Sequence, residues 1–255
     1  MFEIEVFKIF LLVLVRFTGL VVSAPVLGSN NIPVIAKVGL SGLSALLITP
    51  TLPALETPLP DDIVGFASLA VGELMIGLMI GVAMTITFAA IQVGGQVLDM
   101  QTGFGLMNIF NPALETQVPV FGFFLFLIAA LYLLVTDGHA MMIRALASTY
   151  AQIPPGGFAA KPELLFEVST WGRVMFIDGI LIAAPVAGAL MLAYVTMGLL
   201  GRLIPQIHLF VIGFPITIAL GLIVVALSLT VYLHLLDGMF HRMFRDVGAM
   251  VRGLA

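Results

Sequence analysis

Residues 63–93 read IVGFASLAVGELMIGLMIGVAMTITFAAIQV, and Glu73 is the single charged residue in this stretch. A helix that crosses a bilayer needs about 20 predominantly apolar residues. A helix of about 31 residues would rise about 46 Å, whereas the hydrocarbon core is about 30 Å thick. The stretch therefore predicts a membrane helix that tilts, kinks or continues beyond the bilayer.

The whole chain shares this apolar character. Of its 255 residues, 61% are hydrophobic and 9% are charged, and the mean hydropathy is +1.18. Soluble domains carry about 25% charged residues. We predict an all-α, polytopic membrane protein of about six hydrophobic helices, forming a single domain over residues 1–255. The other predicted segments are Ile9–Leu27, Val34–Ile48, Val118–Val135, Val174–Leu200 and Leu203–Leu236. The segment Val34–Ile48 is short for a full crossing of the membrane.

The basic residues predict an orientation, because lysine and arginine favour the cytoplasmic side of a membrane. If Met1 is cytoplasmic and all six segments cross, Arg202 is the loop residue that falls outside. Both termini are then predicted to be cytoplasmic, together with Lys8, Arg144, Lys161, Arg173, Arg242, Arg245 and Arg252. The net charge of −4 gives no support for nucleic-acid binding.

Prolines and glycines predict where the helices break. Pro25 and the polar turn from Gly28 make the first two segments a helical hairpin, and the connector Pro50–Asp62 contains four prolines, which exclude a helix. Pro185 and Pro215 lie well inside the last two segments and predict kinks. We expect kinked helices arranged as hairpins.

A polar stripe follows the third segment. Gln92, Gln96 and Asp99 are spaced four and three residues apart, with Gln101 just beyond, so one helix face carries the first three. A charged residue that faces lipid costs a few kcal/mol. The stripe therefore predicts a pore lining or a subunit interface, unless the helix has already left the membrane and the stripe is solvated.

Three of the charged residues within apolar segments are expected to be buried: Arg16, Glu73 and Asp178. Arg16 and Glu73 have opposite charge and can form an ion pair, although the sequence does not bring them together. Arg173 is an alternative partner for Asp178. A proton relay through Glu73, Asp99 and Asp178 is the functional alternative to structural pairing.

Small residues recur at helix-packing spacing, first at Gly77 and Gly81. Such faces allow close approach of two backbones, within one chain or between chains. Two further faces have this pattern: Gly179, Ala183 and Ala187, then Gly213, Thr217 and Gly221. The motifs of zinc proteases, phosphate-binding loops and serine hydrolases are missing, and the histidines are scattered. We expect neither a catalytic site nor a bound metal or cofactor.

Taken in order, several short motifs resemble the FliR family of the flagellar type III protein export gate, and the resemblance covers essentially the whole chain. Its sharpest part is the turn GRLIPQIHLF at residues 201–210. Other markers are Arg16, Pro25, Glu73, Gly77 and Gly81, the run GQVLDMQTG at 95–103, Asn111-Pro112 and Asp137-Gly138-His139. His208 and Thr217 depart from the residues usual in the family.

The resemblance implies a non-enzymatic subunit that forms a channel with FliP-like and FliQ-like subunits, beside FlhB-like and FlhA-like components. Unfolded flagellar proteins would leave the cytoplasm through it, in the bacterial inner membrane at the flagellar basal body, where membrane lipid would also contact the chain. It also implies a turn typical of the family at Arg202, Pro205 and Gln206. The loop 103–112 would help to plug the closed pore with Phe104, Leu106, Met107, Ile109 and Phe110, and a loop that only packs in the core is the alternative.

Two other classes compete with this interpretation. A secondary transporter coupled to protons or solutes would also have broken helices and buried carboxylates, but it is expected to show an internal repeat, which this sequence lacks. A membrane-embedded enzyme requires a catalytic cluster. The related injectisome export apparatus is the alternative machine within the resemblance, and we favour the flagellar one.

Overall fold

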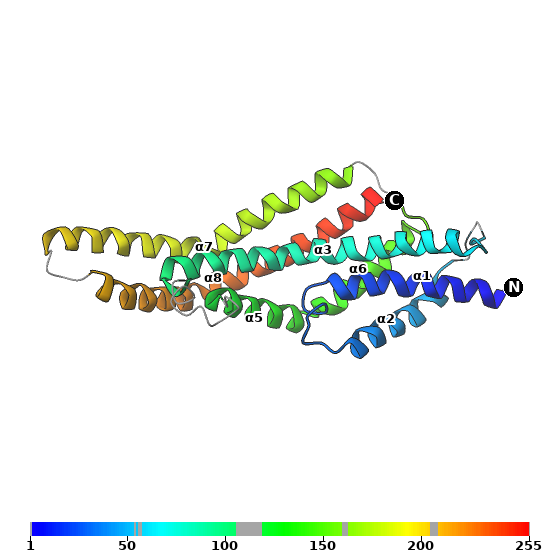
Figure 1. The fold of residues 1–255 in the computed structure, drawn as a ribbon, viewed down its shortest axis with the longest axis horizontal. Helices are drawn as coiled ribbons and strands as arrows, with labels where there is room; N and C mark the ends of the chain where they lie inside the picture. The colour runs from blue at the N-terminus through cyan, green and yellow to red at the C-terminus, as the bar shows by residue number, and fades with distance from the viewer. Residues whose placement is uncertain are drawn as a thin grey trace. The chain divides into compact units, whose positions relative to one another are not determined.

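The structure is a computed structural model, and it describes residues 2–53, 55, 58–105, 119–159, 163–204 and 209–254. All regular secondary structure in these ranges is helical, and Figure 1 shows the helices along the chain. Five helices are long and apolar enough to cross a membrane, or six if the broken pair α5 and α6 is counted as one span. The predicted all-α, polytopic membrane fold is confirmed.

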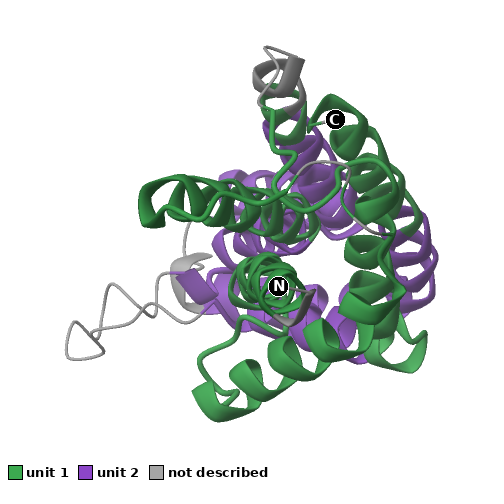
Figure 2. Ribbon diagram, turned by 90° about the vertical axis from the view of Figure 1, so that its right-hand side faces the viewer, with its two compact units in different colours: residues 1–87, 132–171, 241–255 green, residues 88–131, 172–240 purple. Residues whose placement is uncertain are grey.

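The chain divides into two compact units, coloured separately in Figure 2. Unit 1 comprises residues 1–87, 132–171 and 241–255, and unit 2 comprises residues 88–131 and 172–240. Helices α3, α5, α7 and α8 each contribute residues to both units. The single domain predicted for residues 1–255 stays a prediction.

Unit 1 begins with a helical hairpin of α1 (Phe2–Ser23) and α2 (Val34–Ile48), which lie side by side in Figure 1. Helix α1 ends before Pro25, because the residue preceding a proline is disfavoured in a helix. The turn is compact, since the Gly28 amide donates to the Ala24 carbonyl at 2.8 Å. A short 3-10 turn, η1 (Thr49–Thr51), follows α2 and leads into the proline-rich connector.

Helix α3 (Ile63–Thr102) is longer than the apolar stretch that predicted it. Its start is capped by Asp62, whose Oδ2 accepts a 2.6 Å hydrogen bond from the Gly65 amide. It ends at Thr102, and the following Gly103 has a φ of 93°, the left-handed conformation usual after a helix C-terminus. The predicted polar stripe is therefore part of the same helix as the apolar stretch.

The next two helices, α5 (Val120–Val135) and α6 (Gly138–Ser148), form a broken pair. Asp137 stands at the break with a left-handed φ of 55°, and its carbonyl accepts hydrogen bonds from the Ala140 and Met141 amides. A 3-10 turn, η2 (Thr149–Ala151), continues α6. Helix α5 matches the predicted fourth segment, Val118–Val135.

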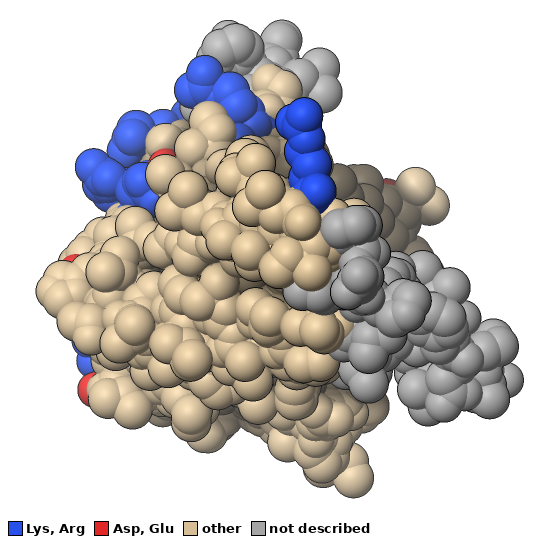
Figure 3. Space-filling view, turned by 90° about the vertical axis from the view of Figure 1, so that its left-hand side faces the viewer, with Lys and Arg blue, Asp and Glu red and all other residues tan. Residues whose placement is uncertain are grey.

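The last two helices are α7 (Glu163–Leu203) and α8 (Leu209–Leu254), which contain Pro185 and Pro215. The sixth segment was expected to end at Leu236, but α8 continues to Leu254. The physical reason is a helical repeat of buried apolar residues beyond that point: Met239, Phe240, Met243, Val247, Met250, Val251 and Leu254. Figure 3 shows that uncharged residues make up most of the described surface on the face that it draws.

Candidate functional site

Two fully buried residues of opposite charge meet in unit 1, where Arg16 on α1 contacts Glu73 on α3. Both residues have 0% exposed surface. Arg16 Nε donates to Glu73 Oε2 at 2.5 Å, and Nη2 donates to Oε1 at 2.9 Å. A buried charge is tolerated when its partner is close and its remaining hydrogen-bonding groups are satisfied. The structure thus brings together two of the three charges that were predicted to be buried.

The region after α6 completes this polar cluster. Arg16 Nη1 donates to Thr149 Oγ1 at 2.8 Å, and both Nη atoms lie 3.2 Å from the Ile153 carbonyl oxygen. Glu73 Oε1 also accepts a 2.7 Å hydrogen bond from the Gly156 amide. The guanidinium carbon of Arg16 lies 4.0 Å from the ring centroid of Tyr150, a cation–π distance. The cluster therefore joins α1, α3 and the η2 turn.

The α1–α3 contact depends on two glycines at which the helices approach closely. A Cβ atom added at Gly77 would overlap the backbone carbonyl oxygen of Arg16, and one at Gly81 would overlap Ser23. On the α1 side, a Cβ atom at Gly19 would lie 2.8 Å from the Leu74 carbonyl oxygen. The predicted packing face of Gly77 and Gly81 is thus used within the chain, against α1.

In unit 2, Asp99 connects the last turn of α3 with the beginning of α5. Its exposed fraction is 4%. Asp99 Oδ1 accepts from the Phe121 amide at 3.0 Å, and Oδ2 accepts from the Gly122 amide at 3.2 Å. Amides at a helix N-terminus lack partners within the helix, so the carboxylate satisfies two of them and interacts favourably with the helix dipole. Asp99 caps α5 from another helix.

Further contacts fix the residues on either side of the predicted plug loop. The Thr102 carbonyl accepts a 3.0 Å hydrogen bond from Thr217 Oγ1 on α8. The rings of Phe104 and Phe121 lie edge to face, with centroids 5.6 Å apart. A Cβ atom at Gly95 would overlap the backbone of Gly122, so α3 and α5 approach closely. Leu106, Met107, Ile109 and Phe110 lie outside the described residues.

The polar stripe divides in the structure. Gln92 and Gln96 are exposed and Asp99 is buried, although all three belong to α3. Gln101 is half-buried, its carbonyl accepts a hydrogen bond from the Tyr194 hydroxyl, and its side-chain Oε1 has no hydrogen-bond partner. Two residues of the stripe are thus available to a pore or a partner, while Asp99 is occupied within unit 2.

The other predicted residues are distributed as follows. Asp178 is buried in unit 2 with 6% exposure, and Arg173 is exposed. Arg202 is exposed near the end of α7, whereas Pro205 and Gln206 lie outside the described residues. Thr217 and Gly221 contact Thr102. A Cβ atom at Gly179 would lie 3.0 Å from the Ala90 carbonyl oxygen. The predicted packing faces of α7, at Gly179, and of α8, at Thr217 and Gly221, therefore also pack against α3 within the chain.

Several members of the buried cluster were not predicted from the sequence. Thr149 and Tyr150 carry no charge and fall outside the predicted apolar segments. Gly156 takes part through its backbone amide, which has no residue-specific signature. Within the described ranges, no three histidine, aspartate or glutamate side chains lie close enough together to hold a metal ion.

Comparisons with known proteins agree with this arrangement of motifs. The family described as bacterial export proteins, family 1, matches residues 7–243. The flagellar biosynthetic protein FliR of Escherichia coli (strain K12) is 29% identical over 243 residues, which cover 94% of this chain and 92% of that protein. FliR of Pectobacterium carotovorum is 31% identical over 230 residues, covering 90% and 87%. FliR of Bacillus subtilis (strain 168) is 28% identical over 244 residues, covering 93% and 92%.

Proposed function

This chain belongs to the bacterial export proteins of family 1, and from that membership we propose that it is a non-enzymatic, channel-forming subunit of the flagellar protein export gate. The resemblance to the FliR family is confirmed, and the chain is a multi-pass membrane component of a flagellar export apparatus. The finer assignment gives it FliP-like and FliQ-like partners in the inner membrane at the basal body, with FlhB-like and FlhA-like components nearby. Unfolded flagellar proteins are its substrates.

The observation that carries this proposal is the large apolar surface of α7 and α8. The most apolar stretch of each of these two helices is only 22% buried within the chain. The helical segments Val168–Leu203 and Ile212–Leu254 that contain these stretches have 36 and 43 residues. At about 1.5 Å per residue they measure about 54 and 65 Å, roughly twice the thickness of a bilayer core. Exposed apolar side chains continue along α7 from Phe176 to Leu203, farther than one bilayer core, which supports burial by other subunits.

The plug is proposed from the flanks of the loop 103–112. Asp99, Thr102 and Phe104 fix the α3 side, and Phe121 and Gly122 fix the α5 side. Apolar side chains placed between fixed ends can close a pore by excluding water from a narrow passage. Phe104, Leu106, Met107, Ile109 and Phe110 are the side chains proposed for this role.

Co-purification tests the subunit assignment. The tagged full-length chain, extracted from the membrane in mild detergent, should co-purify with two different membrane proteins of the FliP and FliQ types. A secondary transporter would instead be isolated alone or as a homo-oligomer. Isolation of the chain without any other membrane protein, from cells that assemble flagella, would contradict the proposal.

A further inference from the structure

The last turn of α3 is held by hydroxyl groups from two other helices of unit 2. The last four carbonyl groups of a helix have no partner within that helix, and on α3 two of them belong to Gln101 and Thr102. The Tyr194 hydroxyl on α7 donates to the Gln101 carbonyl, and Thr217 Oγ1 on α8 donates to the Thr102 carbonyl at 3.0 Å. Two consecutive carbonyls at the end of α3 are therefore satisfied by α7 and α8.

Close packing against α8 fixes the same turn. Thr102 has 0% exposed surface and Thr217 has 2%. A Cβ atom at Gly221 would overlap Thr102 Cγ2, and a Cβ atom at Gly103 would lie 2.6 Å from the ring of Phe214. These two glycines let α8 approach the turn, so the hydroxyl of Thr217 reaches the carbonyl of Thr102.

This turn also carries one end of the loop 103–112. Asp99, in the same turn, accepts hydrogen bonds from two amides at the beginning of α5 and so joins the α3 end to the α5 start. Tyr194 and Thr217 then join the α3 end to α7 and α8. The position of the α3 end is thus coupled to all three of the other helices of unit 2.

We propose that Tyr194 and Thr217 are positioning residues of the export channel, which hold the end of α3 where the channel is closed to ions. The inference rests on the channel function proposed above. A single hydrogen bond changes an equilibrium by roughly threefold to tenfold. The bond from Thr217 is at the weaker end of this range, because its proton is shared with the Phe214 carbonyl at 3.1 Å. Bonds of this strength favour one position of the α3 end and still break when the channel opens.

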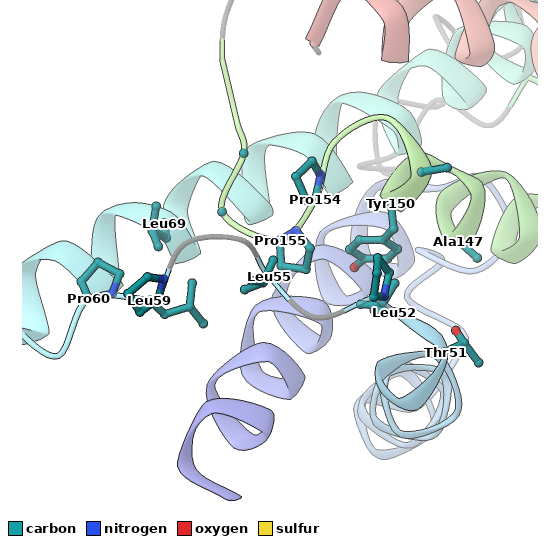
Figure 4. A pocket seen from close by; sticks show the side chains of 15 residues that line it. Thr51, Leu52, Leu55, Leu59, Pro60, Leu69, Ala147, Tyr150, Pro154 and Pro155 are labelled. Carbon is teal, nitrogen blue, oxygen red and sulfur yellow. The ribbon is translucent and has the colours of Figure 1, made fainter. Parts of the chain in front are cut away.

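Two other tyrosines separate this role from general stabilisation. Tyr150 lines the pocket of unit 1 shown in Figure 4, and its hydroxyl has no hydrogen-bond partner in the part of the chain that the structure describes. The Tyr232 hydroxyl on α8 donates to the Leu125 carbonyl at 2.8 Å. Leu125 lies inside α5, where carbonyl groups already accept a bond from their own helix. Loss of the Tyr232 hydroxyl therefore removes a bond between two helices without freeing a helix end.

Conductance of the purified complex in a planar bilayer provides the main test. Tyr194→Phe and Thr217→Val keep the shape of each side chain and remove its hydroxyl. Each should raise the frequency of channel openings roughly threefold to tenfold, and the double variant should raise it further. Tyr150→Phe and Tyr232→Phe are the matched controls and should conduct as the wild type. Wild-type conductance of the double variant would overturn the proposal, as would an equal rise with Tyr232→Phe.

Two further measurements distinguish the hydroxyl groups from packing and assembly. Thr217→Ser keeps a hydroxyl and should conduct as the wild type, whereas a leak equal to that of Thr217→Val would overturn the proposal. Hydrogen–deuterium exchange over residues 100–105 should become faster in Tyr194→Phe and in Thr217→Val, while exchange in α1 stays unchanged. Exchange can be measured on the chain alone, so unchanged exchange over residues 100–105 would overturn the proposal even for a variant that does not assemble.

Deletion of Leu106 to Phe110 separates this proposal from the proposed plug. A leak in the deletion variant, beside wild-type conductance of the double variant Tyr194→Phe/Thr217→Val, would overturn only the role of the hydroxyl groups. A leak in the double variant, beside wild-type conductance of the deletion variant, would overturn the plug and support the hydroxyl groups as the residues that keep the channel closed. Wild-type conductance of both variants would overturn both proposals.

Discussion

Arg16 and Glu73 form a two-point ion pair between α1 and α3, and neither residue has any exposed surface. The guanidinium N–H groups are shared among Glu73, Thr149 and the Ile153 carbonyl, so the positive charge is surrounded by acceptors. The nearby backbone contact at Gly77 permits this geometry, because it lets the two helices approach closely. The charge pair and the small-residue face therefore act together in joining α1 to α3.

Removing one partner of this pair should strongly destabilise unit 1. Arg16→Met or Glu73→Gln would leave a buried group without its partner, which costs about 3–5 kcal/mol. Thermal unfolding of the purified chain in detergent should show a lower midpoint for each variant. The double variant Arg16→Met/Glu73→Met should recover much of the loss, because it removes both buried charges.

The exposed pair Lys8–Asp61 provides the control for this prediction. Hydrogen bonding to Lys8 and its positive charge lower the pKa of Asp61, but the carboxylate is fully exposed to solvent. Asp61→Asn should therefore change the unfolding midpoint little. Equal destabilisation by Asp61→Asn and Glu73→Gln would show that burial does not determine the effect.

A side chain at Gly77 should prevent α1 from docking on α3. The leucine Cβ in Gly77→Leu would overlap backbone atoms of α1, which cannot move aside as a flexible side chain can. Such overpacking lowers the free energy of unfolding by about 1–3 kcal/mol. Gly81→Leu should act in the same direction. The expected result is loss of co-purification with partner subunits, accompanied by increased protease sensitivity of the chain itself.

Gly42→Leu is the matched control for the glycine variants. Gly42 lies on α2, and a Cβ atom there has no neighbour within 4 Å in the described residues. This variant should leave the fold of the isolated chain unchanged. Normal co-purification of Gly77→Leu with its partners would contradict the role assigned to the α1–α3 contact.

Much of the fold follows from apolar runs and helix breakers. The predicted segment Val34–Ile48 coincides with α2, and the prolines around Pro25 and Pro50 mark real helix ends. The end of α8 was placed too early, because a lower density of apolar residues was taken as the end of a helix. The repeat of buried residues from Met239 to Leu254 is visible in the sequence and supports the longer helix.

The polar sites were less predictable because most of their contacts involve backbone atoms. Opposite charges within apolar runs indicated a pair of Arg16 and Glu73, but the carbonyl of Ile153 and the amide of Gly156 could belong to any residue type. Asp99 was grouped with Gln92 and Gln96 by helical spacing alone. Its role depends on the amides of Phe121 and Gly122, which come close only in the fold.

Deletion of Leu106 to Phe110 should leave the complex assembled and make it leaky to ions. The contacts of Asp99 and Thr102 lie outside the deleted residues, so we expect the complex to assemble without them. Conductance of the purified complex in a planar bilayer provides the measurement. A control variant in which glycine and serine replace the five residues keeps the length of the loop and removes only its apolar side chains. This variant should leak ions as well. Unchanged conductance in the deletion variant would exclude the plug.

Replacing Asp99 should loosen the beginning of α5. Asp99→Ala leaves the Phe121 and Gly122 amides without an acceptor, and loss of a cap costs about 0.5–2 kcal/mol. Hydrogen–deuterium exchange over residues 120–124 should become faster, while exchange in α1 stays unchanged. Gln96→Ala, at an exposed position one turn earlier on α3, is the control and should exchange as the wild type. If both variants gave the same exchange over residues 120–124, Asp99 would not be the group that caps α5.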